Sequence, residues 1–129
     1  MATATSKKLT IVVEKGPGNL SAKLKYRSDL LTTTAKDLGG IKRGFLEQLE
    51  GFYDIPSDQV EFKVEYEVSG FFETHKYINV SELGKVVDIN PSLLRHYASG
   101  LRRPNKDQLK KIENGVQKIG REMAKIALV

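Results

Sequence analysis

Two kinds of hydrophobic spacing divide the chain. Over the first half, apolar residues alternate with polar ones, which is the period of a strand with one buried face. This alternation predicts strands at residues 9–13, 20–26, 30–35 and 60–68. Between the last two strands, apolar residues recur at spacings of three and four and predict a helix over residues 37–53.

The predicted helix adds a second layer to this sheet. Its buried stripe consists of Ile41, Phe45, Leu49 and Phe52. Gly39, Gly40 and Gly44 lower the helix propensity of its first turns, and the hydrophobic pattern gives no reason for them. The order βββαβ predicts an α+β unit in which the helix covers one face of the sheet. The last strand then returns parallel to an earlier one by a right-handed crossover.

Start and stop signals in the second half predict two short helices. Asn79 followed three residues later by Glu82 resembles a capping box and begins the first helix, which runs to about residue 87. Asn90 caps the second helix, whose first residue is Pro91, and Gly100 ends it. Two short helices joined by a three-residue turn have the geometry of a helix-turn-helix.

Apolar residues give these helices their inward faces. They are Leu83, Val86 and Val87 in the first helix, Ile89 in the turn, and Leu94 and Tyr97 in the second helix. The run from Ser81 through Leu94, Tyr97, Ser99-Gly100 and Arg102-Arg103-Pro104 resembles the lambda-repressor-like (Xre-type) helix-turn-helix family. The resemblance covers residues 77–115 and implies that the second helix enters the DNA major groove.

Two sets of residues are the candidates for contacts with double-stranded DNA. The first turns of a recognition helix reach base edges, and we expect Ser92, Arg95 and His96 to make those contacts. Arg95 suits the bidentate contact with guanine. Phosphate contacts are expected from the backbone N–H of Asn79 at a helix N-terminus and, from the resemblance and their exposure, from Arg102 and Arg103.

The charge of the chain is concentrated in this half. Residues 76–129 contain 11 Lys and Arg against 5 Asp and Glu, whereas residues 1–75 contain 10 against 11, so the overall charge of +5 divides into +6 and −1. A local excess of this kind attracts polyanions. Basic helices are also commonly just solvated, so charge alone decides little.

A stripe of apolar residues continues to the end of the chain. It consists of Leu109, Ile112, Val116, Ile119, Met123 and Ile126, spaced alternately three and four apart. We expect the first part to complete the core of the helical half, and Ile119, Met123 and Ile126 to form a homodimer. Two recognition helices about 34 Å apart would then read an inverted repeat. The alternative is that the whole stripe folds back on the N-terminal sheet.

The order of elements over nearly the whole chain resembles the HicB-like antitoxins. That resemblance implies a truncated RNase H-like unit followed by a DNA-binding half, and a transcriptional autoregulator that also binds and blocks a small RNase toxin of a toxin-antitoxin pair. The expected divisions are a flexible tail at 1–7, the HicB-like unit at 8–69, a linker at 70–76, and the helix-turn-helix with its C-terminal helix at 77–129. A stand-alone regulator that uses its sheet for oligomerisation or ligand sensing is the alternative.

Other classes are disfavoured by what the sequence contains. The complete RNase H-like fold needs clustered carboxylates, but Glu14 falls at a strand end and Glu47 and Glu50 lie on the outer side of a helix. We therefore expect no enzymatic activity, metal or cofactor. With no cysteine and no long apolar run, the chain is expected to be cytoplasmic with no membrane partner. The alternative to DNA binding is a protein-binding module whose helix-turn-helix serves assembly.

Overall fold

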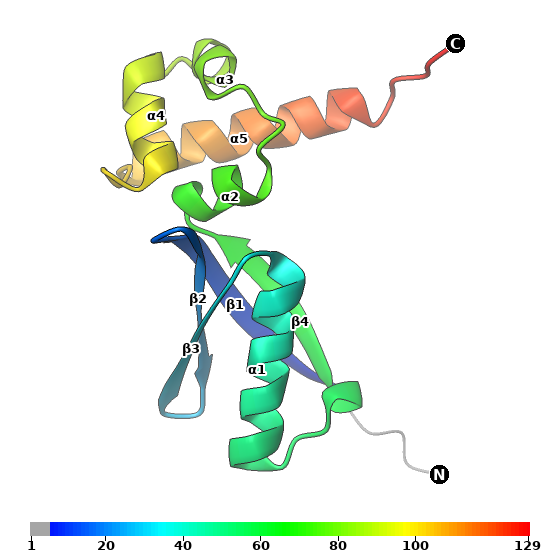
Figure 1. Cartoon of the computed structure of the whole chain (residues 1–129). Helices are drawn as coiled ribbons and strands as arrows, with labels where there is room; N and C mark the ends of the chain where they lie inside the picture. The colour runs from blue at the N-terminus through cyan, green and yellow to red at the C-terminus, as the bar shows by residue number, and fades with distance from the viewer. Residues whose placement is uncertain (1–5) are drawn as a thin grey trace. The chain divides into compact units, whose positions relative to one another are not determined.

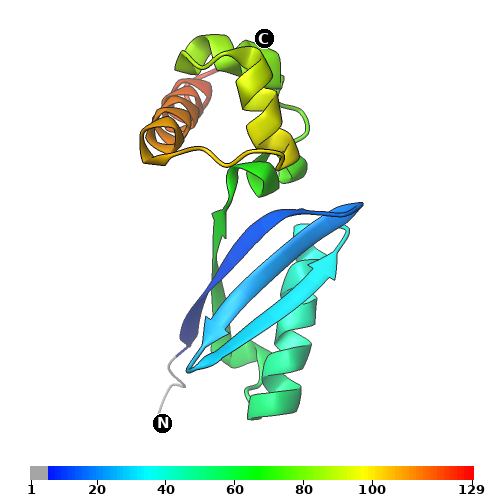
Figure 2. The ribbon, with the colours of Figure 1, turned by 90° about the vertical axis from the view of Figure 1, so that its left-hand side faces the viewer.

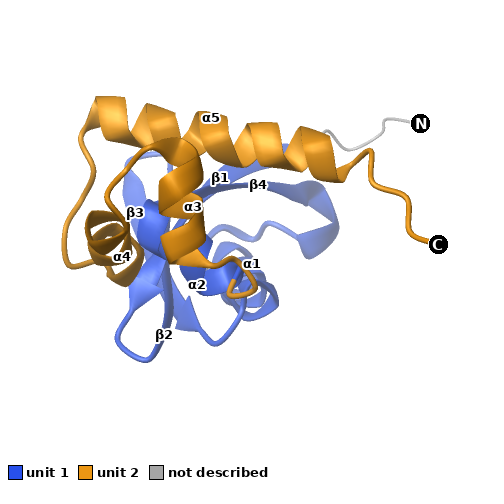
Figure 3. Ribbon diagram, turned by 90° about the horizontal axis from the view of Figure 1, so that it is seen from above, with its two compact units in different colours: residues 1–75 blue, residues 76–129 orange. Residues whose placement is uncertain are grey.

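The computed structural model describes residues 6–129, which form two compact units. Unit 1 ends at residue 75 and unit 2 begins at residue 76 (Figure 3). Of the tail predicted at 1–7, residues 1–5 lie outside the described part, and Lys7 already begins a strand. In the part of the chain that is described, no helix combines the length and apolar character needed to cross a bilayer.

Unit 1 is a four-stranded mixed sheet with helices (Figure 1). Its elements are β1 (Lys7–Gly16), β2 (Asn19–Tyr26), β3 (Asp29–Ala35), α1 (Leu38–Tyr53), the short 3-10 helix η1 (Ser57–Gln59), β4 (Val60–Tyr66) and α2 (Val68–Thr74). The strand order is β3-β2-β1-β4, with β1 antiparallel to β2, β2 antiparallel to β3, and β1 parallel to β4. The predicted order βββαβ and the parallel return of the last strand are therefore confirmed.

The core of unit 1 lies between the sheet and α1, which covers one face of it (Figure 2). It is built from Ile11, Val13, Leu20, Ala22, Leu24, Tyr26, Leu31, Ile41, Phe45, Leu49 and Ile55. The prediction that Phe52 is buried is wrong, because its side chain is 72% exposed. Tyr53, four residues after Leu49, faces the sheet instead, and its ring meets that of Tyr26 edge-on at 4.7 Å between centroids.

Two of the three glycines in α1 have a packing reason. A Cβ added to Gly40 would lie 2.7 Å from the Cβ of Ala35, and one added to Gly44 would lie 2.5 Å from Oγ1 of Thr33. Both neighbours belong to β3, so α1 approaches this edge strand more closely than a side chain at either position permits. A Cβ added to Gly39 meets only ordinary contacts, the nearest at 3.4 Å, and nothing in the structure explains that glycine.

The segment predicted as a linker, residues 70–76, belongs mostly to α2. The strand predicted at 60–68 ends at Tyr66, and the helix begins two residues later. The backbone of α2 passes so close to β1 that a Cβ on Gly70 would overlap the carbonyl oxygen of Val13. Ser69 Oγ also accepts a hydrogen bond from the backbone N–H of Lys15 at 3.1 Å. Residues 70–75 are thus part of unit 1, and α2 packs against its sheet.

Unit 2 contains α3 (Val80–Val87), α4 (Pro91–Ser99) and α5 (Lys106–Met123). The first two match the predicted helices, including the three-residue turn between them. The buried apolar residues are Leu83, Val87, Ile89, Leu94, Tyr97 and Ile112. The expectation that Val86 faces inward is wrong, because it is 61% exposed and the neighbouring Val87 takes the inward position.

Candidate nucleic-acid interface

Both short helices of unit 2 begin at an asparagine cap. Asn79 Oδ1 accepts a hydrogen bond from the backbone N–H of Glu82 at 3.0 Å, and Asn90 Oδ1 accepts one from that of Ser92 at 2.8 Å. The Glu82 carboxylate pairs with Lys85 Nζ at 3.1 Å. Side-chain caps satisfy backbone N–H groups that a helix start leaves unpaired, which explains why the sequence predicted both starts well.

The turn between α3 and α4 is closed by backbone geometry. Asp88 ends α3 with a φ of 58°, a conformation that aspartate adopts more readily than most residues. The backbone N–H of Ile89 then donates to the carbonyl oxygen of Gly84 at 3.0 Å. A Cβ on Gly84 would lie 2.9 Å from the Ile89 carbonyl oxygen, so this tight return requires glycine. The orientation of α4 against α3 is fixed accordingly, with Leu94 fully buried beneath it.

The predicted base-contact residues share the exposed side of α4. Arg95 and His96 follow Ser92 by three and four residues, the spacings that place each of them beside Ser92 on the helix surface, and all three are exposed. The structure therefore brings this set together at the N-terminal and middle turns of α4.

Arg95 is held in place from two helices. Its guanidinium donates from Nη1 to Ser81 Oγ at 2.6 Å and from Nη2 to Ser92 Oγ at 3.0 Å. Ser92 belongs to the same helix as Arg95, whereas Ser81 lies on α3. Ser81 was not among the predicted contact residues, because its approach to Arg95 depends on the packing of α3 against α4 and leaves no signal in the local pattern.

The predicted phosphate-contact residues divide between two places. Asn79 lies at the start of α3, two residues before Ser81. Arg102 and Arg103 are exposed and follow the C-terminal end of α4, where Gly100 adopts a φ of 81°. The backbone N–H of Arg102 donates to the carbonyl oxygen of His96 at 3.3 Å, which fixes this segment to the helix.

Helix α5 completes the core of unit 2 with its first part only. Ile112 is 3% exposed, and a Cβ on Gly115 would overlap Cγ1 of Val87, so α5 and α3 are in close contact there. The expectation for the first part of the stripe is thus confirmed for Ile112 but not for Leu109, which is 44% exposed. Further along, Ile119 is half-buried, and Met123 is 59% exposed.

The end of the apolar stripe differs from the prediction. The helix ends at Met123, so Ile126 lies beyond it and does not continue the helical face. Its side chain is 61% exposed, and its backbone N–H donates to the Met123 carbonyl oxygen at 3.1 Å in a final turn. Of the three predicted dimerisation residues, only Ile119 and Met123 therefore share the regular helix.

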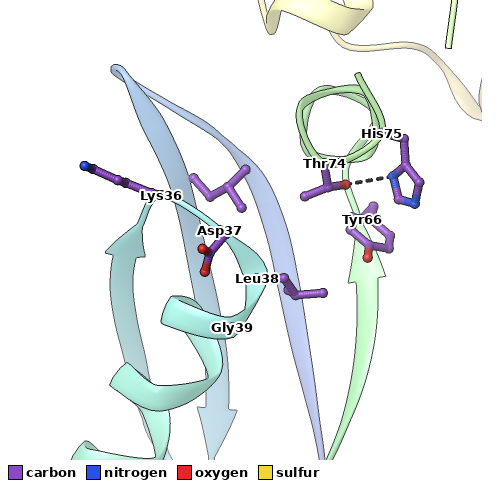
Figure 4. A pocket seen from close by; sticks show the side chains of 8 residues that line it. Lys36, Asp37, Leu38, Gly39, Tyr66, Thr74 and His75 are labelled. Carbon is purple, nitrogen blue, oxygen red and sulfur yellow. Dashed lines mark hydrogen bonds between the residues drawn. The ribbon is translucent and has the colours of Figure 1, made fainter. Parts of the chain in front are cut away.

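Unit 1 contains a hollow of about 410 Å³ beside the start of α1 (Figure 4). It is lined by Leu20, Lys36, Asp37, Leu38, Gly39, Tyr66, Thr74 and His75. His75 is half-buried, and its ring stacks on that of Phe71 at 4.7 Å between centroids. Its Nδ1 lies 2.8 Å from both the Phe71 carbonyl oxygen and Thr74 Oγ1. The Asp37 carboxylate caps α1 through the Gly40 backbone N–H at 2.8 Å.

The carboxylates considered for catalysis lie in ordinary structural positions. Glu14 is half-buried near the end of β1, opposite Ser21 of β2, and Glu47 and Glu50 are exposed on α1. Within residues 6–129, no three His, Asp or Glu side chains are grouped as metal ligands would be.

Comparison with known proteins gives no further description of the chain, because no family model, no curated protein and no solved structure matches it significantly.

Proposed function

We propose that this chain is a sequence-specific DNA-binding transcriptional regulator that reads double-stranded DNA with α4. The observation that carries the proposal is the exposed guanidinium of Arg95, held on the outer face of α4 by Ser81 and Ser92. Arginine is the side chain that most often reads guanine in the major groove. A fixed guanidinium in the middle of a short capped helix suits that contact.

The arrangement of α3, the turn and α4 supports a helix-turn-helix of the lambda-repressor-like (Xre) type. The two helices are short, they are joined by three residues, and both begin at side-chain caps. In this proposal Ser92 and His96 accompany Arg95 at base edges. Asn79, Arg102 and Arg103 hold phosphates on either side, which fixes the register of the protein without reading sequence.

A homodimer follows from the proposal, because short recognition helices gain affinity and specificity by reading two half-sites. The exposed end of α5, with Ile119 and Met123 on the helix and Ile126 after it, is the proposed contact between copies. Half-sites one helical turn apart, about 34 Å, would appear as an inverted repeat.

The order of elements in unit 1 supports a HicB-like, truncated RNase H-like unit. In this proposal the regulator is the antitoxin of a pair and binds a small RNase toxin, and it acts in the cytoplasm. The second candidate function is a protein-binding module in which α3 and α4 serve assembly. The exposed apolar end of α5 supports that candidate, because an exposed apolar surface can contact a protein partner without any contribution from DNA.

Fluorescence anisotropy with the DNA upstream of the gene and a scrambled duplex tests the proposal. The wild-type chain should prefer the upstream duplex, and Arg95→Ala should reduce that preference by about 10- to 100-fold. Arg102→Ala should weaken binding to both duplexes alike and lower the salt dependence of the affinity by about one unit of log–log slope. Weak, equal binding of the wild-type chain to both duplexes would contradict DNA readout and favour the assembly module.

A further inference from the structure

We propose that Ser81 is a positioning residue for Arg95: its hydroxyl fixes the guanidinium in the orientation that reads a base, although Ser81 itself need not touch DNA. This inference rests on the proposed DNA-binding function and deepens it by naming a specificity-determining residue on α3.

The two serine contacts of Arg95 differ in what they can fix. Ser92 lies three residues before Arg95 on the same helix, so its hydrogen bond at 3.0 Å orients the side chain only along α4. Ser81 lies on α3, 14 residues earlier, and accepts the shorter bond, 2.6 Å from Nη1. Together the two hydroxyls hold both terminal nitrogens of the guanidinium from two directions.

The frame that carries Ser81 is rigid relative to α4. The Asn79 cap fixes the start of α3, and the hydrogen bond from the Ile89 N–H to the Gly84 carbonyl oxygen closes the turn. Leu83 and Leu94, at 5% and 0% exposure, pack beneath the two helices. The separation between Ser81 and Arg95 is therefore set by packed structure and not by a mobile loop.

Holding Arg95 before DNA arrives lowers the cost of recognition. A free arginine side chain carries about 2 kcal/mol of rotamer entropy, which binding must otherwise remove. A guanidinium has five N–H donors, and the serines occupy only two of its nitrogens, so N–H groups remain for a base edge. Removing the Ser81 hydroxyl should thus weaken the contribution of Arg95 to sequence preference more than the overall affinity.

A double-mutant cycle tests this coupling. The variants are Ser81→Ala, Arg95→Ala and the pair together, with the preference for the upstream over the scrambled duplex as the readout. Ser81→Ala should lower the preference by about 3- to 10-fold in the wild-type background and leave it unchanged in the Arg95→Ala background. Ser81→Thr keeps a hydroxyl on the same Cβ and should restore most of the preference.

The matched control is Ser28→Ala. Ser28 is also an exposed serine, but it lies between β2 and β3 of unit 1 and belongs to neither α3 nor α4. This variant should retain the wild-type preference. Nitrogen-15 relaxation of the Arg95 Nε–H in the DNA-free protein gives a second readout, and Ser81→Ala should increase the mobility of that group while circular dichroism stays unchanged.

The outcomes separate the inference from the proposed function. Specific binding by the wild-type chain with an equal loss from Ser81→Ala in both backgrounds would show that Ser81 acts independently of Arg95, and would overturn the inference alone. Unchanged preference and unchanged mobility of the Arg95 Nε–H in Ser81→Ala would overturn it as well. Absence of any preference in the wild-type chain would contradict the proposed function, and the inference would fall with it.

Discussion

The two units bury their apolar side chains to different extents. Ten large hydrophobic residues are exposed in the described part of the chain, and eight of them lie in unit 2. The same unit holds the excess of positive charge, +6 against −1 for unit 1. A local excess of one charge is typical of regions that bind oppositely charged partners. Unit 1 therefore buries more of its large apolar side chains than unit 2 does, and the proposed function assigns the contacts with partners to unit 2.

Gly70 and Gly115, one in each unit, both make close contacts but differ in the kind of atom that they meet. In unit 1, Gly70 of α2 lies against backbone, the Val13 carbonyl oxygen of β1. In unit 2, Gly115 of α5 lies against a side chain, Cγ1 of Val87. A backbone carbonyl within a sheet cannot move without disturbing its neighbours, whereas a valine side chain has some freedom to adjust. Substitutions at these two positions should therefore differ in cost.

Gly70→Ala should have the largest effect. The added Cβ overlaps the Val13 carbonyl oxygen, which also accepts a hydrogen bond from the Glu67 N–H, so α2 must move away from β1. We expect a loss of about 3 kcal/mol in the free energy of unfolding, measured by urea denaturation. Gly51→Ala in α1 is the matched control, because nothing lies within 4 Å of its added Cβ. A small effect at Gly70 would contradict the described packing of α2.

The proposed dimer contact is tested by a double substitution, Met123→Glu with Ile126→Glu. Charged side chains at these exposed apolar positions should weaken association by about 2 kcal/mol or more, because both would be buried between copies. Sedimentation equilibrium should then give a mass near 14.4 kDa in place of twice that value. Leu30→Glu, at a 62% exposed position in unit 1, is the control and should leave the dimer intact. If the double variant still sediments with the mass of a dimer, the end of α5 does not form the contact between copies.

Gly115→Ala should cost less than Gly70→Ala. We expect a loss of about 1 to 2 kcal/mol, since crowding of Val87 is partly offset by the higher helix propensity of alanine. Val87→Ala in the same chain should relieve the overlap, so the two losses should not add. Gly120→Ala, where nothing lies within 4 Å, should leave stability unchanged or raise it. Additive losses at 115 and 87 would count against the contact between α5 and α3.

The smallest effect concerns Tyr53 on the surface of unit 1. The hydrogen bond from its hydroxyl to the Asp29 carboxylate raises the pKa of Tyr53 above 10.0, because it stabilises the neutral phenol. The contribution of this hydrogen bond to the free energy of unfolding is complete at neutral pH, and it is lost as the pH rises through the raised pKa of Tyr53. Asp29→Ala should return the pKa of Tyr53 towards 10.0 in an ultraviolet absorbance titration, with Tyr53→Phe identifying its signal. Identical titration curves for the wild-type chain and Asp29→Ala would contradict the hydrogen bond between Tyr53 and Asp29.

Local signals in the sequence predicted much of this structure. The alternation in β1 and β2, the stripe of Ile41, Phe45 and Leu49, and the caps of α3 and α4 all depend on residues near in sequence. Helix α2 was missed because the alternation of β4 continues to Val68, so the strand was extended into it. Phe52 and Val86 were misplaced because each has an apolar neighbour, Tyr53 or Val87, that takes the inward position.

Features that depend on tertiary packing could not be predicted in this way. The reasons for Gly40 and Gly44 lie on β3, and neither spacing nor propensity reveals how closely a helix approaches a strand. Ser81 is similar, since its contact with Arg95 requires the orientation of α4 against α3. The sequence therefore indicated which residues of α4 were exposed, while the structure added which residue holds the arginine.

In vitro selection from a random pool of duplexes tests DNA readout by α4 most directly, because it needs no assumption about the operator. The wild-type chain should enrich an inverted repeat whose half-site centres lie about 34 Å apart, and Arg95→Ala should lose enrichment at a guanine within each half-site. A pool that remains unenriched after selection with the wild-type chain would contradict sequence-specific DNA binding.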